Sequence, residues 1–384
     1  MLALRLARGT HPLVLLRRLM VAAASAGVGF LLLCTLTYAL AHPTDSGSGL
    51  RLLWCLIPLA ATAHFAVAVA RTDPSTRPRA GLSAVGLGPA RLGVLAAVST
   101  AVAGTLGSAF ALLLFLHLRG DLTGLPFDGA AAELLAAGRP LPLAAALTLL
   151  ALVPLASTTA TALALRPRRA RPGADPEAPD APSAAPSGLP WGVALIAAGL
   201  AVETYAGRGA PGSPLPLPGH FDGSSSGVLA GWALTALGLA LAGPGITRFC
   251  GRALQSARPG ATRLLAGRIL MEESGRIGRP LGVVCAVASA AIAASNLQDT
   301  DPHPFGPLTG LGAALVMICT TATLLTAALE AKQARADTTK SLRRLGTPTA
   351  TLRNATALRA VTLLTVFAPL TWGVAALAAL PFSA

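Results

Sequence analysis

Residues 18–41 read RLMVAAASAGVGFLLLCTLTYALA, and Arg18 is their one charged residue. An α-helix needs about 20 apolar residues to cross the hydrocarbon core of a bilayer, so this stretch is long enough to span a membrane. Further apolar stretches follow at about 50–70, 92–116, 143–165, 190–206, 227–247, 281–297, 307–329 and 359–380. The sequence therefore predicts an all-α fold, a polytopic transmembrane helical bundle of nine spans.

The overall composition agrees with a membrane protein. Of the 384 residues, 53% are hydrophobic and 12% are charged, which is outside the range of ordinary soluble domains. The formal net charge of +14 is high enough to raise the question of nucleic-acid binding. The basic residues flank apolar spans, however, and have few aromatic residues between them, so we expect no nucleic-acid partner.

The basic residues divide unequally between the two sets of loops. Of the 30 Lys and Arg residues, 26 lie in the amino-terminal segment and in every second loop after it. The other side has Arg51, Arg119, Arg139 and Arg208. Because cytoplasmic loops carry the excess of Lys and Arg, we expect the amino terminus inside and the carboxyl terminus outside. The preference for Arg over Lys and the abundance of Ala, Gly and Pro are typical of proteins encoded by GC-rich bacterial genomes. We therefore expect the protein to lie in a bacterial cytoplasmic membrane.

The chain lacks the common motifs of catalysis and nucleotide binding. No G-x-x-x-x-G-K-[ST], G-x-S-x-G or H-E-x-x-H pattern occurs. The five cysteines have neither C-x-x-C nor zinc-ligand spacing, so we expect them to be small buried hydrophobic side chains. The sequence thus predicts neither an enzyme nor a bound cofactor or metal.

Two polar residues within predicted spans are candidates for a functional intramembrane site. Glu203 is an acid near the outer end of the fifth span, where it either forms such a site or reaches the lipid headgroups. His64 lies well within the second span, where a helix–helix hydrogen bond is the alternative to a functional role. In the seventh span, Gly282, Ala286, Ala290 and Ala294 recur every four residues and predict a close helix contact.

Two loops contain similar segments at a constant offset of 260 residues. Residues 82–92 read LSAVGLGPARL, and residues 342–352 read LRRLGTPTATL. In each segment we expect a glycine to break a short helix at the membrane face. A third basic segment, 261–271, fits either a helix lying in the membrane interface or a stretch that only touches anionic lipid.

The LRRLGTP sequence resembles the basic Leu-Arg-x-Leu-Gly segment of the FtsX-like permease domain of ABC transporters. This resemblance implies a permease that works with a cytoplasmic ATPase dimer and moves a lipid, peptide or hydrophobic compound. The residues implied in contact with the ATPase are Leu342, Arg343, Arg344, Leu345, Gly346 and Pro348, with Leu82, Val85, Gly86 and Gly88 in the first segment. The first segment lacks the Arg pair, so we expect it to be the weaker contact.

The resemblance also implies two FtsX-like pseudo-repeats. We expect the first at 1–165, a Pro- and Ala-rich cytoplasmic linker at 166–190, two connecting spans at 191–259, and the second repeat at 260–384. Such permeases typically have ten spans, so on this resemblance we expect the second repeat to lack its last span. The alternative function is therefore a degenerate, non-transporting scaffold or immunity protein. A secondary transporter is a third possibility, which the scarcity of deep charged residues disfavours.

Overall fold

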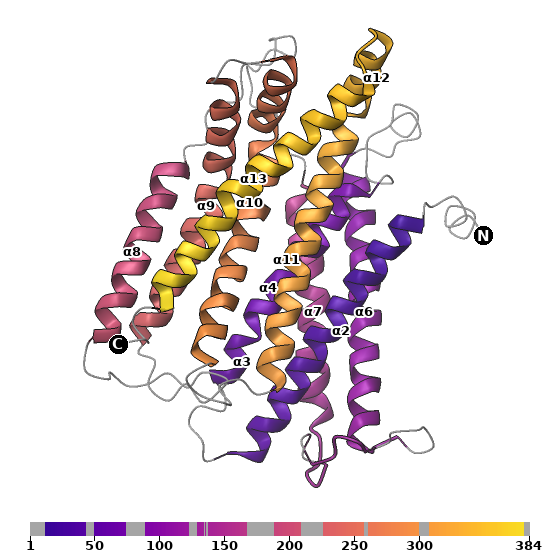
Figure 1. The fold of residues 1–384 in the computed structure, drawn as a ribbon. Coiled ribbons are helices and arrows are strands. Elements are labelled where there is room, and N and C mark those ends of the chain that lie inside the picture. The colour runs from indigo at the N-terminus through magenta and orange to yellow at the C-terminus, as the bar shows by residue number, and fades with distance from the viewer. Residues whose placement is uncertain are drawn as a thin grey trace, which may run out of the picture. The chain divides into compact units, whose positions relative to one another are not determined.

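The computed structural model describes residues 12–43, 50–73, 89–122, 129–133, 135, 137–166, 188–208, 226–256, 260–298 and 307–379. Their helices (Figure 1) are α2 (Pro12–Ala41), α3 (Leu50–Trp54), α4 (Leu56–Thr72), α6 (Pro89–Arg119), α7 (Leu143–Ala164), α8 (Gly188–Arg208), α9 (Ser226–Ser256), α10 (Ala261–Gln298), α11 (Pro307–Ala334), α12 (Ala336–Arg344) and α13 (Thr349–Ala379). Within these ranges no strand occurs, and nine helices are long and apolar enough to cross a membrane. The predicted all-α polytopic bundle is confirmed.

The helices form two compact units. The first contains the described residues between 12 and 166 together with 307–323 of α11, and the second contains the described residues of 188–298 together with 324–379. This grouping divides α11, whereas the predicted second repeat includes all of it. The repeat boundaries therefore stay a prediction.

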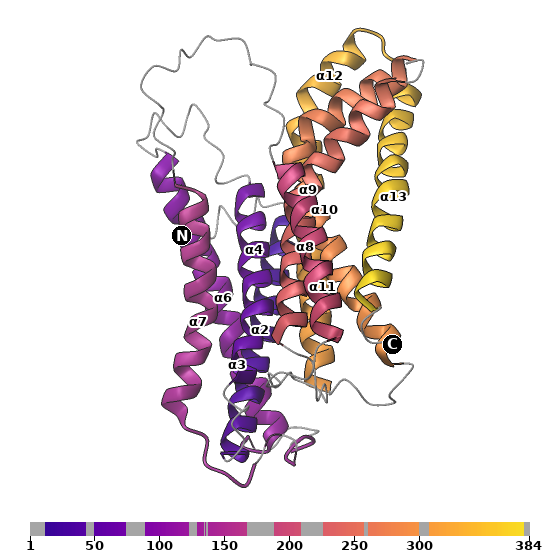
Figure 2. The same ribbon diagram turned by 90° about the vertical axis from the view of Figure 1, so that its left-hand side faces the viewer.

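The first unit packs through large apolar side chains. α2 lies against α6, and α6 lies beside α7 (Figure 2). One cluster of buried residues includes Val28, Phe65 and Val153, and a second includes Leu33 and Phe115. Burying a side chain of this size contributes about 1.5–3 kcal/mol relative to water, although helices in a bilayer are held together mainly by packing contacts.

The second unit packs through glycine. α9 lies between α8 and α10, and α13 packs against α10. A Cβ atom added to Gly238 of α9 would lie 2.7 Å from the carbonyl oxygen of Gly192 in α8. A Cβ on Gly278 of α10 would lie 2.5 Å from the Cα of Pro244 in α9. The backbones of these three helices approach one another too closely for any side chain at these positions.

The helices extend beyond several predicted spans, and the largest difference is in α10. Its 38 residues correspond to about 57 Å, compared with a hydrocarbon core of about 30 Å. The segment 261–271 is helical and forms the first turns of α10, and whether it lies in the membrane interface or only touches anionic lipid stays a prediction. Gly267 lies against α9, where its added Cβ would be 2.6 Å from the carbonyl oxygen of Gly251.

Two predictions about small residues have different outcomes. All five cysteines are free and buried, as predicted. The small-residue face of the seventh span is confirmed for Gly282 and Ala286, which are buried, but not for Ala290, which is exposed. Close contacts with α9 occur along 267–282 of α10, where Gly267, Gly278 and Gly282 meet Gly251, Pro244 and Leu239.

Candidate coupling segment and ion cluster

The segment implicated by the family resemblance forms a short exposed helix and a tight turn. We call residues 336–348 the coupling segment; it joins α11 to α13 and contains α12 (Figure 1). No residue of α12 is buried, and Leu345, just after it, is 83% exposed. The last turn of α12 carries Arg343 and Arg344. The result is an exposed surface with an apolar side chain next to two guanidinium groups.

Gly346 reverses the chain at the end of α12. Its φ of +86° lies in the left-handed region that a Cβ disfavours. The N–H of Gly346 donates to the carbonyl of Arg343 at 3.1 Å, and the N–H of Thr347 donates to the carbonyl of Leu342 at 3.1 Å. These two bonds are those of a Schellman motif, which satisfies the last carbonyls of a helix. The predicted helix-breaking turn at Gly346 is confirmed.

The structure places the predicted residues of the two segments differently. In the coupling segment Leu342 is half-buried, while Arg343, Arg344, Leu345, Gly346 and Pro348 are exposed. Leu82, Val85, Gly86 and Gly88 lie outside the described residues. A role for either segment in binding an ATPase stays a prediction.

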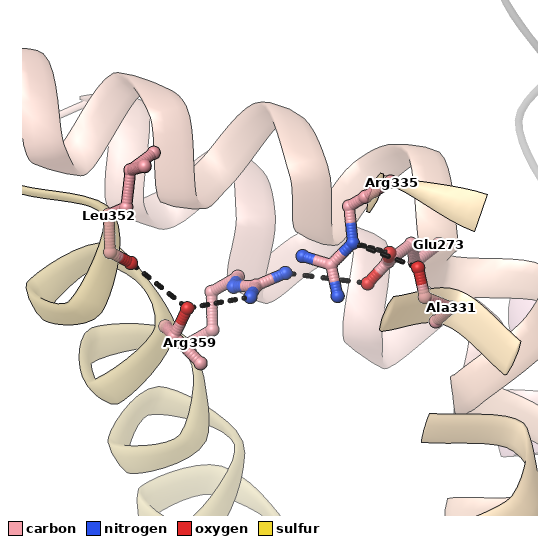
Figure 3. Close-up of polar contacts among 6 residues, drawn as sticks. Glu273, Ala331, Arg335, Leu352 and Arg359 are labelled. Atoms are coloured by element: carbon pink, nitrogen blue, oxygen red, sulfur yellow. Dashed lines mark hydrogen bonds and ion pairs between the residues drawn. The ribbon is translucent and has the colours of Figure 1, made fainter. Parts of the chain in front are cut away.

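A buried ion cluster lies at the base of the coupling segment (Figure 3). Glu273 of α10 forms an ion pair through Oε1 with Arg335 Nε at 2.5 Å, and its Oε2 accepts a hydrogen bond from Arg359 Nη1 at 3.4 Å. Arg335 is the residue immediately before α12, and Arg359 lies in α13. Glu273 is 6% exposed and Arg359 is 8% exposed. One carboxylate therefore links α10 to the residues on both sides of the coupling segment.

Further hydrogen bonds extend the cluster into the neighbouring helices. Arg335 Nε also donates to the carbonyl of Ala331 in the last turns of α11, at 3.1 Å. On the other side, Arg359 Nη2 donates to Thr356 Oγ1 at 3.3 Å, and Thr356 Oγ1 donates to the carbonyl of Leu352 at 3.0 Å (Figure 3). The polar contacts thus run from the end of α11 to the first turns of α13.

Sequence reasoning did not find this cluster. It counted Arg335 and Arg359 as loop charges that set the orientation of the chain, and it gave Glu273 no role. The three residues are far apart in sequence, and no short motif joins them. The available signal was weak: Glu272 and Glu273 are acids in a segment that is otherwise strongly basic.

Glu203 is buried between two helices. It is 1% exposed, and Thr235 Oγ1 of α9 donates to Glu203 Oε1 at 3.2 Å. A Cβ added to Gly231 would lie 2.5 Å from Glu203 Cγ, so the absence of a side chain at Gly231 makes room for the acid. The expectation that Glu203 reaches the headgroups is wrong, because its carboxyl group faces α9.

His64 lies on the exposed face of α4. No hydrogen bond joins its ring to another residue in the part of the chain that the structure describes. The expected helix–helix hydrogen bond is therefore absent from this part, and the structure does not bring His64 together with any other candidate residue.

The chain was compared with protein-family models, curated proteins and solved structures. No protein-family model, curated protein or solved structure matches the chain.

Proposed function

We propose that this protein is the transmembrane permease subunit of an ABC transporter. In this proposal it couples a separate cytoplasmic ATPase dimer to the movement of a lipid, peptide or hydrophobic compound. The observation that carries the proposal is the coupling segment, an exposed basic helix with a glycine turn that joins two membrane-spanning helices. A segment in this place can receive a force from a soluble partner and pass it directly into both helices.

The chemistry of the segment suits a protein surface that contains carboxylates. Arg343 and Arg344 present planar groups that bind carboxylates through two hydrogen bonds each. Leu345 adds an apolar anchor beside them, and it is almost fully exposed. Binding energy at protein interfaces concentrates in such a centre, where an apolar or arginine side chain becomes desolvated.

In the proposed mechanism, the ATPase supplies the energy and this chain converts it into movement. Closure of the ATPase dimer shifts α12. The ends of α11 and α13 follow, because the coupling segment connects them without a long flexible stretch. The span bundle then changes shape, which displaces a molecule taken from the bilayer.

We also propose that the protein lies in a bacterial cytoplasmic membrane with the coupling segment inside. The support is the charge distribution, because the basic residues gather on the side of the chain that includes the coupling segment. We expect a cysteine replacing exposed Ser341 to react with a membrane-impermeant maleimide in inside-out vesicles and not in right-side-out vesicles. A cysteine replacing Ala137, which is exposed and lies near Arg139 on the other side of the predicted membrane, should show the opposite pattern.

The five native cysteines should add little background to this labelling, because all of them are buried. Labelling of both introduced cysteines from the same side would contradict the proposed orientation.

The experiment that tests the proposed function is co-purification from membranes of the source cell. The tagged protein, extracted in mild detergent, should retain a polypeptide with a P-loop motif, identified by mass spectrometry, together with ATP hydrolysis that vanadate inhibits. If a stable preparation contains no P-loop polypeptide, the transporter proposal is wrong, and the scaffold or immunity function takes its place.

A further inference from the structure

The coupling segment is held at both of its ends by the same carboxylate. Arg335 immediately precedes α12, and Arg359 lies in α13 beyond the turn. Both contact Glu273 of α10, at 2.5 and 3.4 Å. The coupling segment itself has almost no buried residue, so packing within the described residues does little to fix its position. The buried ion cluster is the contact that lies at its base.

The first unit has a related ion pair. Arg18 Nη2 near the start of α2 pairs with Asp73 Oδ2, just after α4, at 2.6 Å. Ser99 of α6 lines a small cavity together with Arg18 and Asp73. Ser99 stands 260 residues before Arg359, which is the offset of the two similar segments. The Arg18–Asp73 pair joins α2 to the end of α4, as the Glu273–Arg335 pair joins α10 to the end of α11.

Burial makes the cluster sensitive to the loss of one member. A buried ion pair adds little stability compared with apolar residues of the same volume, but removing one partner leaves a buried charge without compensation. Loss of the Glu273 charge would leave two arginines without their counter-ion. The cluster is therefore better suited to fixing the positions of α10, α12 and α13 than to adding stability.

We propose that Glu273 is a positioning residue that fixes the coupling segment to α10. Through Arg335 it holds the start of α12, and through Arg359 it holds the first turns of α13. The coupling segment then moves as one body with these helices and does not bend separately. The inference rests on the proposed function only in naming α12 as the docking site, since the fixed position of α12 is a property of this chain alone.

The test is limited proteolysis of the purified protein in lipid nanodiscs, without any ATPase. Trypsin cuts a helix only when it opens, so the initial rate of cleavage after Lys340, Arg343 and Arg344 reports how often α12 is released. We expect Glu273→Gln to raise this rate on the order of tenfold, because both arginines lose their negatively charged ion-pair partner. Arg335→Gln should raise it similarly while leaving the α10–α13 contact in place.

The matched control is Glu272→Gln, the same change at the neighbouring residue, which is exposed. It should leave the cleavage rate within about twofold of the wild-type rate. The double variant Glu273→Gln with Arg335→Gln restores the net charge of the three residues to its wild-type value. It should still be cut rapidly, whereas a role limited to charge balance predicts a return toward the wild-type rate.

Wild-type cleavage of Glu273→Gln and Arg335→Gln, or an equal increase in Glu272→Gln, would overturn the proposal. If Glu273→Gln fails to fold, Arg335→Gln alone decides the question, because Arg335 is partly exposed and its loss leaves Arg359 paired with Glu273. A negative result in the ATPase co-purification leaves this test unaffected, so the two proposals fail separately.

Discussion

Gly238→Ala is expected to separate α8 from α9 and to destabilise the second unit by about 1–3 kcal/mol, the usual cost of overpacking a close contact. An added Cβ would lie 2.7 Å from both the Gly192 carbonyl oxygen and the Ile196 amide nitrogen. Both are backbone atoms, so a change of rotamer cannot relieve the clash and one helix must shift. The measurement is the midpoint temperature of unfolding in detergent, which is monitored through the loss of monodisperse protein.

Gly275→Ala in α10 is the matched control for this substitution. Nothing lies within 4 Å of its added Cβ, and Gly275 is exposed. Alanine is favoured over glycine inside a helix by about 0.5–1 kcal/mol, so this variant should be as stable as the wild type or more so. If the two variants have the same midpoint temperature of unfolding, α8 and α9 do not approach each other this closely.

The amount of co-purifying ATPase is expected to fall at least about tenfold in the variant that combines Arg343→Glu, Arg344→Glu and Gly346→Val. Reversing both charges replaces attraction to carboxylates by repulsion, and a close charge pair at an interface contributes about 1.5 kcal/mol or more. Valine at a φ of +86° is strained, so the turn that presents Leu345 should also change. The measurement is the amount of ATPase recovered at equal permease level.

The control for the triple variant is Arg268→Glu with Arg279→Glu, which makes the same change of charge on exposed positions of α10. It should retain most of the ATPase, because these residues lie outside the coupling segment. Equal loss in both variants would show that the partner responds to net charge, and retention by the triple variant would show that the coupling segment is not the contact.

The sequence was sufficient to predict the class of fold. Apolar length predicted the nine spans, because backbone groups in a bilayer must be satisfied within a helix. It also predicted the turn at Gly346, since a glycine after a helical run indicates a left-handed cap. Helix ends were less predictable: α10 continues through Arg263 and Arg268, because glycine contacts with α9 favour a helix where hydropathy alone indicates an end.

The candidate site was only partly predictable. The coupling segment carries a local sequence pattern, whereas Glu273, Arg335 and Arg359 meet only when α10, α11 and α13 are assembled. The prediction that Glu203 reaches the headgroups was wrong for a related reason. Its depth along the helix was readable from the sequence, but the side of α8 that faces α9 depends on the packing of Gly199 and Gly231.

The most direct test of the central claim is photo-crosslinking from position 345 in intact cells. A photoreactive phenylalanine analogue replaces Leu345, the most exposed apolar side chain of the coupling segment, and another replaces Tyr205, which is also exposed. The proposed function predicts that position 345 crosslinks to a P-loop ATPase, identified by mass spectrometry, and that position 205 does not. Crosslinks from position 345 to lipid or to a second copy of this chain alone, with the permease stable and in the membrane, would contradict it.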